Sequence, residues 1–149
     1  MRLRNLPTRL TTGGYILHSG LDKWNAPAEA AQGMHGMASQ SFPVLQKVSP
    51  PTFLKLLAAG EMATGALLLA PMVSPVKAGV VLSAFSGALL TMYARTPGMR
   101  RPGSIWPTPE GIGISKDVWM AGIGAGLVIG GLTDDVRDVA KGTKKALTP

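Results

Sequence analysis

Hydrophobic and polar positions alternate along the chain in long blocks. Runs of apolar and small residues occupy positions 52–70, 76–94 and 116–132, and a less apolar run at 8–24 follows Pro7. At about 1.5 Å rise per residue, a helix over each run covers most of the roughly 30 Å hydrocarbon core of a bilayer. The pattern predicts four membrane-spanning helices. The first is short, so either Arg9 and Lys23 snorkel at its ends or the bilayer thins locally around it.

The segments between these runs predict how the helices are connected. Residues 25–51 keep scattered apolar positions among small and polar ones, which is typical of a short helix at the membrane surface, where His35 would be solvated. The short MVSPVK link makes the next two helices an antiparallel hairpin. The fold class is therefore an all-α integral membrane four-helix bundle (residues 1–132) with a surface helix between helices 1 and 2, followed by a polar tail (133–149).

Small residues recur every fourth position in the last two runs. Such stripes let helix backbones approach closely in lipid, where there is no hydrophobic drive between helices. They serve either packing within the bundle or contact with a partner's transmembrane helix. The positions are Gly79, Ser83 and Gly87 in one run and Gly122, Gly126 and Gly130 in the other.

Composition supports a membrane location. Of 149 residues, 46% are hydrophobic and 15% are charged, and the net charge is +7. The basic residues lie near the ends of the apolar runs, where lipid headgroups are the nearer counter-ions, so we do not expect nucleic-acid binding. Basic residues near both ends place the termini in the cytoplasm: Arg2, Arg4, Arg9, Arg137, Lys141, Lys144 and Lys145. The chain has no cysteine, which excludes thiol chemistry.

Glu61 is an acid in the middle of the run at 52–70. An ionised side chain at mid-bilayer costs at least about 2.5 kcal/mol, so Glu61 should face a partner, a cavity or a proton. Counting residues from the expected membrane surface puts His18, Asp22 and Lys23 within its reach. The cluster either binds a quinone headgroup or passes protons, or it holds helices 1 and 2 in register as a structural pair.

Other candidate chemistry is sparse. Arg95, Arg100 and Arg101 in the loop after the third run could bind lipid headgroups or an acidic partner, or form a solvated cluster. With two histidines and no cysteine, no metal site is expected. No motif of a soluble enzyme occurs, so we name no catalytic residue and do not expect catalysis by the chain alone.

The order of two short motifs resembles the DoxX family. They are G-x-x-K at the end of the first helix (Gly20 to Lys23, within ILHSGLDKW) and Glu61 followed by G-x-x-L (Gly65 to Leu68, within EMATGALLL). The resemblance covers nearly the whole chain. It implies a small four-helix protein of the bacterial inner (plasma) membrane, related to subunits of a thiosulfate:quinone oxidoreductase and to membrane partners of oxidative-stress defence enzymes.

Three functions are consistent with these observations. The first is an accessory or anchoring subunit of a larger membrane protein assembly, with membrane lipids and other subunits as partners. The second is a redox-active subunit that handles quinone, the one candidate cofactor, at Glu61 and His18. The third is a lipid-binding or transport accessory protein.

Overall fold

The structure is a computed structural model that describes residues 3–147, with side chains described up to residue 143. Within this range the chain is all-helical and contains no β-strand, which confirms the all-α prediction. Arg2 and the side chains of Lys144 and Lys145, which entered the prediction of orientation, lie outside the described residues.

Six α-helices and two short 3-10 helices follow one another over the described residues. The α-helices are α1 (Leu6–Trp24), α2 (Ala28–Ser41), α3 (Pro50–Leu69), α4 (Pro75–Arg95), α5 (Ile112–Ser115) and α6 (Asp117–Leu147). The 3-10 helices are η1 (Leu3–Asn5) and η2 (Pro43–Lys47). Proline lies in the first turn of α1, α3 and α4, where its missing N–H costs no hydrogen bond.

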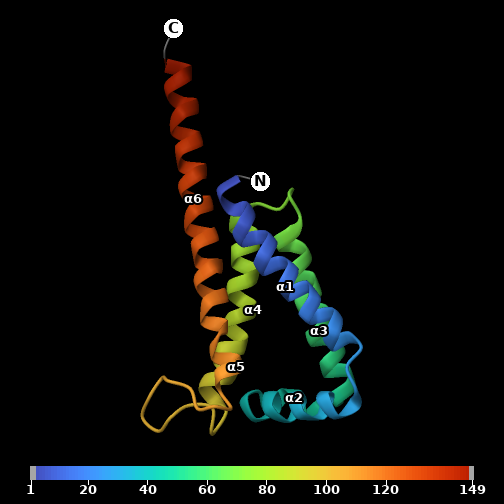
Figure 1. Ribbon diagram of the computed structural model, residues 1–149. Coiled ribbons are helices and arrows are strands. Elements are labelled where there is room, and N and C mark those ends of the chain that lie inside the picture. The colour runs from blue at the N-terminus through green and yellow to red at the C-terminus, as the bar shows by residue number, and fades with distance from the viewer. Residues whose placement is uncertain (1–2, 148–149) are drawn as a thin grey trace.

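The long helices form two antiparallel pairs, α1 with α3 and α4 with α6. Figure 1 shows that the pairs meet near the N-terminus and the α3–α4 link, and diverge toward the other end, where α2 lies across the opening. The predicted four-helix bundle is therefore not confirmed, because the four long helices are arranged as two separate pairs. The reason is that each pair packs tightly within itself, whereas α3 and α4 touch little beyond their link.

Glycines bring α1 and α3 into backbone contact. A Cβ added at Gly20 would lie 2.8 Å from the carbonyl oxygen of Ala58, and one added at Gly65 would lie 2.7 Å from the backbone nitrogen of Leu17. Gly13 is equally confined, 2.9 Å from the Cβ of Leu68. No side chain fits at these positions, so the glycines set the distance between the two helices.

The α4–α6 pair uses only part of the predicted glycine stripes. A Cβ at Gly79 would lie 2.5 Å from the carbonyl oxygen of Gly124, and one at Gly124 would lie 2.4 Å from Ser83 Oγ. Gly131 packs against Val76. Gly79 and Ser83 therefore contact α6 as expected, but they meet Gly124 and not the predicted stripe.

The remaining predicted packing glycines have no helix packed against their Cβ positions in the part of the chain that the structure describes. Gly87, Gly122 and Gly126 have nothing within 4 Å of the Cβ position, and Gly130 meets only the guanidinium of Arg4. In a helix this rich in glycine, several faces satisfy the same four-residue spacing. The bulky side chain of Leu127, buried against α4, decides which face turns inward.

Arg9 is fully buried, so the prediction that it snorkels is wrong. Its guanidinium donates to the carbonyl oxygens of Leu67 (3.1 Å), Leu68 (2.7 Å), Ala70 (2.9 Å) and Val73 (2.9 Å). Carbonyls in the last turn of a helix have no partner in the helix, and a cation there is favourable. Arg9 thus caps the C-terminus of α3 and fixes the α3–α4 link to α1.

The last helix is much longer than the predicted span at 116–132. It continues without a break through most of the predicted polar tail to Leu147, and Figure 1 shows it projecting beyond the ends of the other helices. Arg4 joins the start of the chain to this helix by donating to the Gly130 carbonyl (3.0 Å) and to the Asp134 carboxylate. Both termini consequently lie at the same end of the molecule.

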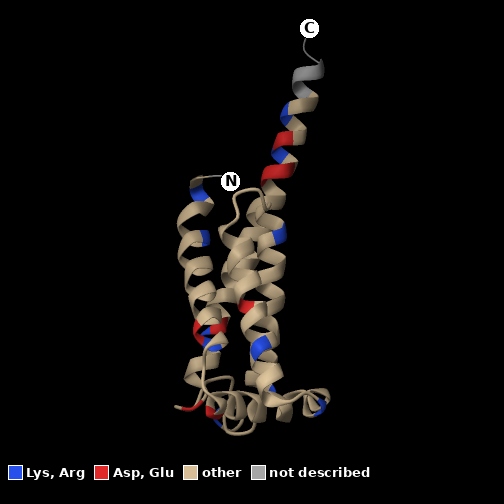
Figure 2. Cartoon of the chain, turned by 90° about the vertical axis from the view of Figure 1, so that its right-hand side faces the viewer, with Lys and Arg blue, Asp and Glu red and all other residues tan. Residues whose placement is uncertain are grey.

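Three helices of the described chain are long and apolar enough to cross a membrane. They are Pro50–Leu69, Pro75–Arg95 and Ile112–Thr143. The last two include the predicted spans 76–94 and 116–132, and the first covers all of 52–70 except its last residue. The run at 8–24 is helical, but it is too polar to count as a fourth membrane-spanning helix by composition. Figure 2 shows much of each long helix free of charged residues, which gather toward the ends, on the projecting part of α6 and in a group partway along the molecule.

The close approach of α1 and α3 predicts that alanine substitution is destabilising at one glycine of α3 and has little effect on stability at another. Gly65→Ala should lower the free energy of unfolding by about 1–3 kcal/mol, because the new methyl overlaps the α1 backbone. Gly60→Ala is the matched control, since its Cβ would be 3.9 Å from the nearest atom outside its own helix, a ring carbon of Phe85. Thermal unfolding in detergent measures both; equal melting temperatures would contradict the observed contact.

Candidate functional site

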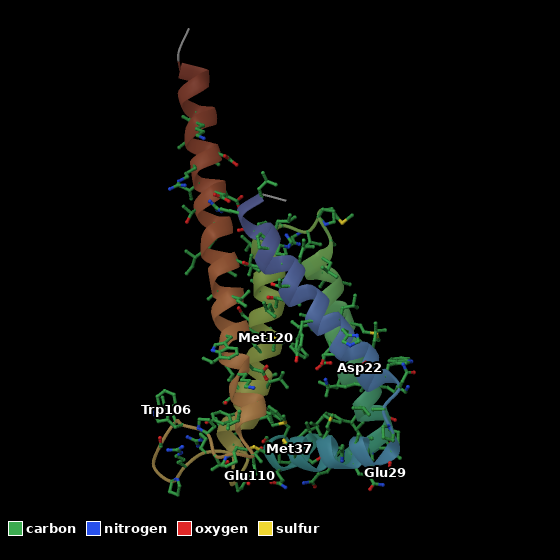
Figure 3. The ribbon with its side chains drawn as sticks, viewed as in Figure 1. Asp22, Glu29, Met37, Trp106, Glu110 and Met120 are labelled. Atoms are coloured by element: carbon green, nitrogen blue, oxygen red, sulfur yellow. The ribbon has the colours of Figure 1, made fainter. Side chains whose placement is uncertain are left out.

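A cavity of about 550 Å³ lies between the two helix pairs, and residues of α2 form part of its wall. Its wall is mostly apolar and includes the aromatic rings of Phe42, Phe53 and Phe85. Met37 of α2 and Met120 of α6 approach it from different sides (Figure 3). Met34 and Met37 of α2 both line this cavity.

Hydrogen bonds at two places along α2 hold it across the cavity. At one end Ser41 Oγ lies 2.8 Å from Thr96 Oγ1, just after α4. Nearer its middle, His35 Nε2 lies 2.9 Å from the Leu45 carbonyl oxygen, and its ring packs edge-on against Phe53 of α3 at 5.6 Å between centroids. The expectation that His35 is solvated is therefore wrong; its ring ties α2 to η2 and α3.

An ion pair lies in the wall between α1 and α3. Lys23 Nζ donates to Glu61 Oε2 at 2.9 Å and to Ser19 Oγ at 2.7 Å. The Glu61 side chain is 8% exposed and the Lys23 side chain 21%. The contact between Lys23 and Glu61 agrees with the cluster predicted from residue depths, and it gives the acid inside the run of apolar residues a cationic partner.

Asp117, the first residue of α6, lines the same cavity from the opposite helix pair. It is close enough to Glu61 and Lys23 for both of their charges to act on it. Sequence reasoning missed this residue. The sequence did contain a signal, because Asp117 is an acid at the start of a long apolar run and at the expected depth of Lys23. Its direction, however, depends on which face of α6 packs against α4, and the sequence alone did not show this.

His18 and Asp22 do not belong to the site. Their side chains are 74% and 69% exposed, and His18 Nε2 lies 3.5 Å from Asp22 Oδ2 on the outer face of α1. The prediction that His18 meets Glu61 is wrong because it considered depth alone. At about 100° per residue, Ser19 and Lys23 share the face toward α3, whereas His18 and Asp22 share the neighbouring face.

The three loop arginines gather around a second, shallower pocket of about 470 Å³. Arg100 Nη2 donates to the carbonyl oxygen of Ala94 at 2.7 Å, and Arg101 Nε donates to that of Pro107 at 3.2 Å. The structure therefore brings together the residues that the sequence named as headgroup or partner candidates. In residues 3–147, no group of three or more His, Asp or Glu side chains is placed to hold a metal ion.

The larger cavity combines an apolar volume with charged groups on two facing walls. Lys23 supplies hydrogen-bond donors, and the carboxyl groups of Glu61 and Asp117 accept hydrogen bonds when ionised and donate when protonated. Such a site suits a molecule that is mostly apolar but carries a small polar head. Comparison with known proteins found no matching family model, no matching curated protein and no matching solved structure.

The Lys23–Glu61 pair should be strongly coupled in stability measurements. Lys23→Met should lower the free energy of unfolding by at least about 2 kcal/mol, because it leaves a buried carboxylate without its cation, and adding Glu61→Met should recover most of that loss. The control is the exposed His18–Asp22 pair on the same helix, where single substitutions to Ala should change stability by less than about 1 kcal/mol. Additive effects of Lys23→Met and Glu61→Met would show that the pair contributes no coupling energy.

Proposed function

We propose that this chain is an integral membrane protein of the DoxX kind that binds a lipophilic molecule with a polar head, of the quinone class, between its two helix pairs. The observation that carries the proposal is the cavity of about 550 Å³, whose apolar wall is interrupted by Lys23, Glu61 and Asp117. We propose no independent catalysis. Binding is the step that the arrangement of these side chains supports.

The proposal includes α1 as a fourth transmembrane helix beside the three apolar ones. Its composition is too polar to cross a bilayer alone, but α1 runs antiparallel along α3. Its basic side chains at positions 9 and 23 are bound by α3 and the link that follows it. Paired in this way, they no longer carry the full cost of isolated charges in lipid. Four crossings place both termini on one side, which we propose to be the cytoplasmic side of a bacterial inner membrane.

The polar groups suit a headgroup with acceptors at both ends. Lys23 has three N–H donors and uses two of them on Ser19 and Glu61, which leaves one for a ligand carbonyl. Across the cavity, a protonated Asp117 can donate to a second carbonyl. A quinone ring carries two such oxygens on opposite sides, and its isoprenoid tail would lie along the apolar side chains between the pairs.

Ligand binding should stabilise the protein, and filling the cavity should abolish this effect. With decylubiquinone at about 100 times its dissociation constant, the free energy of unfolding should rise by about 2.7 kcal/mol in lipid nanodiscs. Leu89→Trp fills the cavity and should remove the increase. Val80→Trp on the exposed face of the same helix is the control and should keep it.

Two results would contradict this function. One is equal stabilisation of the Leu89→Trp and Val80→Trp proteins by the quinone. The other is equal stabilisation by decane, which has no headgroup, because the charged side chains would then have no part in recognition. Asp117→Leu separates headgroup recognition from general apolar binding. Asp117 has no hydrogen bond or ion pair among the described residues, so its replacement should not unfold the protein. It should nevertheless weaken quinone binding.

A second function, accessory or anchoring subunit of a larger membrane assembly, is favoured by the outer face of α6. Exposed apolar and small residues recur there with alternating spacings of four and three, the pattern of a helix that packs along another helix. The face points away from α4, which contacts Gly124, Leu127 and Gly131. Its residues are Val118, Gly122, Ala125, Ile129, Leu132, Val136 and Val139.

Substitution beside this face should separate assembly from folding. Gly126→Leu should leave the melting temperature of the purified protein unchanged, since nothing lies within 4 Å of the Cβ position, but should reduce co-purification of partner subunits from native membranes in mild detergent. Gly14→Leu, also in open space but on α1, is the control and should retain the partners. Retention of all partners by Gly126→Leu would argue against α6 as the contact.

A further inference from the structure

The loop between α4 and α5 forms a basic pocket outside the cavity. Gly98 and Gly103 adopt positive φ angles of 84° and 68°, which other residues rarely tolerate. Backbone hydrogen bonds cross the loop from Arg101 to Trp106 (3.0 Å) and from Thr108 to Met99 (3.0 Å). The Tyr93 hydroxyl on α4 donates to the Ile105 carbonyl at 2.7 Å. These contacts hold the loop in one shape against the end of α4.

Three guanidinium groups line this pocket without an acidic partner among the described residues. Arg100 and Arg101 each use one N–H on a backbone carbonyl, which positions the group and leaves its other donors unbound. Arg95 has no hydrogen bond or ion pair within the described chain. No Asp or Glu lines the pocket. The pocket therefore offers a concentrated, oriented set of donors to an anion with several oxygens.

The charge of the nearby helix end does not oppose an anion here. The C-terminus of a helix carries partial negative charge on its free carbonyls. Arg100 occupies one of these by donating to Ala94 in the last turn of α4. The bound guanidinium offsets part of the negative charge of the helix end beside the pocket.

Apolar side chains next to the pocket indicate the source of the anion. Ile105 is 75% exposed and Trp106 67% exposed, although backbone hydrogen bonds cross the loop that carries them. Figure 3 shows Trp106 at the outer edge of the loop, away from α2 and the cavity. Tryptophan is enriched where headgroups meet acyl chains. With α4 crossing the bilayer, the end of its last turn lies at that level.

We propose that Arg95, Arg100 and Arg101 bind the phosphate of an acidic phospholipid, while Ile105 and Trp106 contact its glycerol and upper acyl chains. Guanidinium groups match phosphate oxygens in geometry and charge, and a basic group near an anionic surface contributes roughly fivefold in affinity. The proposal rests on the membrane location of α4 and α6. It is independent of any ligand in the cavity, so loss of quinone binding would leave it standing.

The test compares lipids and variants by native mass spectrometry and by melting temperature in detergent. Dioleoyl phosphatidylglycerol should bind and stabilise the wild-type protein, and dioleoyl phosphatidylcholine should do so at least tenfold more weakly. Arg95→Gln is the main variant, because Arg95 has no contact within the described chain whose loss would disturb the fold; it should weaken phosphatidylglycerol binding roughly fivefold. Arg100→Gln together with Arg101→Gln should reduce it further.

Controls distinguish this lipid from other ligands and other basic residues. Arg137→Gln on the exposed part of α6 should bind phosphatidylglycerol like the wild type. Sodium phosphate up to millimolar concentration should not raise the melting temperature; equal protection by free phosphate would overturn the lipid assignment. Equal binding of phosphatidylglycerol by wild type, Arg95→Gln and the double variant would overturn the site, as would binding of phosphatidylcholine with the same affinity.

Discussion

The whole arrangement depends on the binding of two basic side chains of α1 by α3 and the link that follows it. Near one end of α1, Arg9 is surrounded by four carbonyl oxygens at the end of α3 and in the α3–α4 link. Near the other end, Lys23 pairs with Glu61. Between them the glycines of both helices allow backbone contact. A helix too polar to enter lipid by its own composition is thereby joined to one that is apolar enough, and its charges have partners before any membrane is considered.

This pairing also explains why a cavity lies between the two helix pairs. Arg9 ties the α3–α4 link to α1, and Arg4 ties the start of the chain to α6, so the two helix pairs are fastened at one end. Among the described residues, no arginine joins the pairs in this way at the other end, where α2 spans the gap through Ser41 and His35. The space that remains has an apolar wall with Lys23, Glu61 and Asp117 on facing sides. The cavity is thus a consequence of strong contacts within the pairs and few between them.

Depth along a helix was predictable from the sequence, but rotation about the helix axis was not. Residue counting correctly placed Lys23 near Glu61, because Glu61 lies below the level at which α1 ends and the long side chain of Lys23 can reach it. The same count wrongly included His18, which is on another face of α1, and chose Gly122 and Gly126 in place of Gly124. Arg9 was expected at the surface because burial of an arginine needs acceptors that only the tertiary structure supplies. Asp117 was missed for the related reason that its direction depends on how α6 packs on α4.

The central claim is that α1 crosses the membrane alongside α3. The most direct test is to measure from which side of the membrane each end of α1 can be chemically labelled. The chain has no cysteine, so single cysteines introduced at Leu3, Gln40 and Thr143 report their positions with a membrane-impermeant maleimide on sealed vesicles of known orientation. The account predicts that Leu3→Cys and Thr143→Cys react from one side and Gln40→Cys from the other. Reaction of Leu3→Cys and Gln40→Cys from the same side would show that α1 does not cross, and would contradict the account.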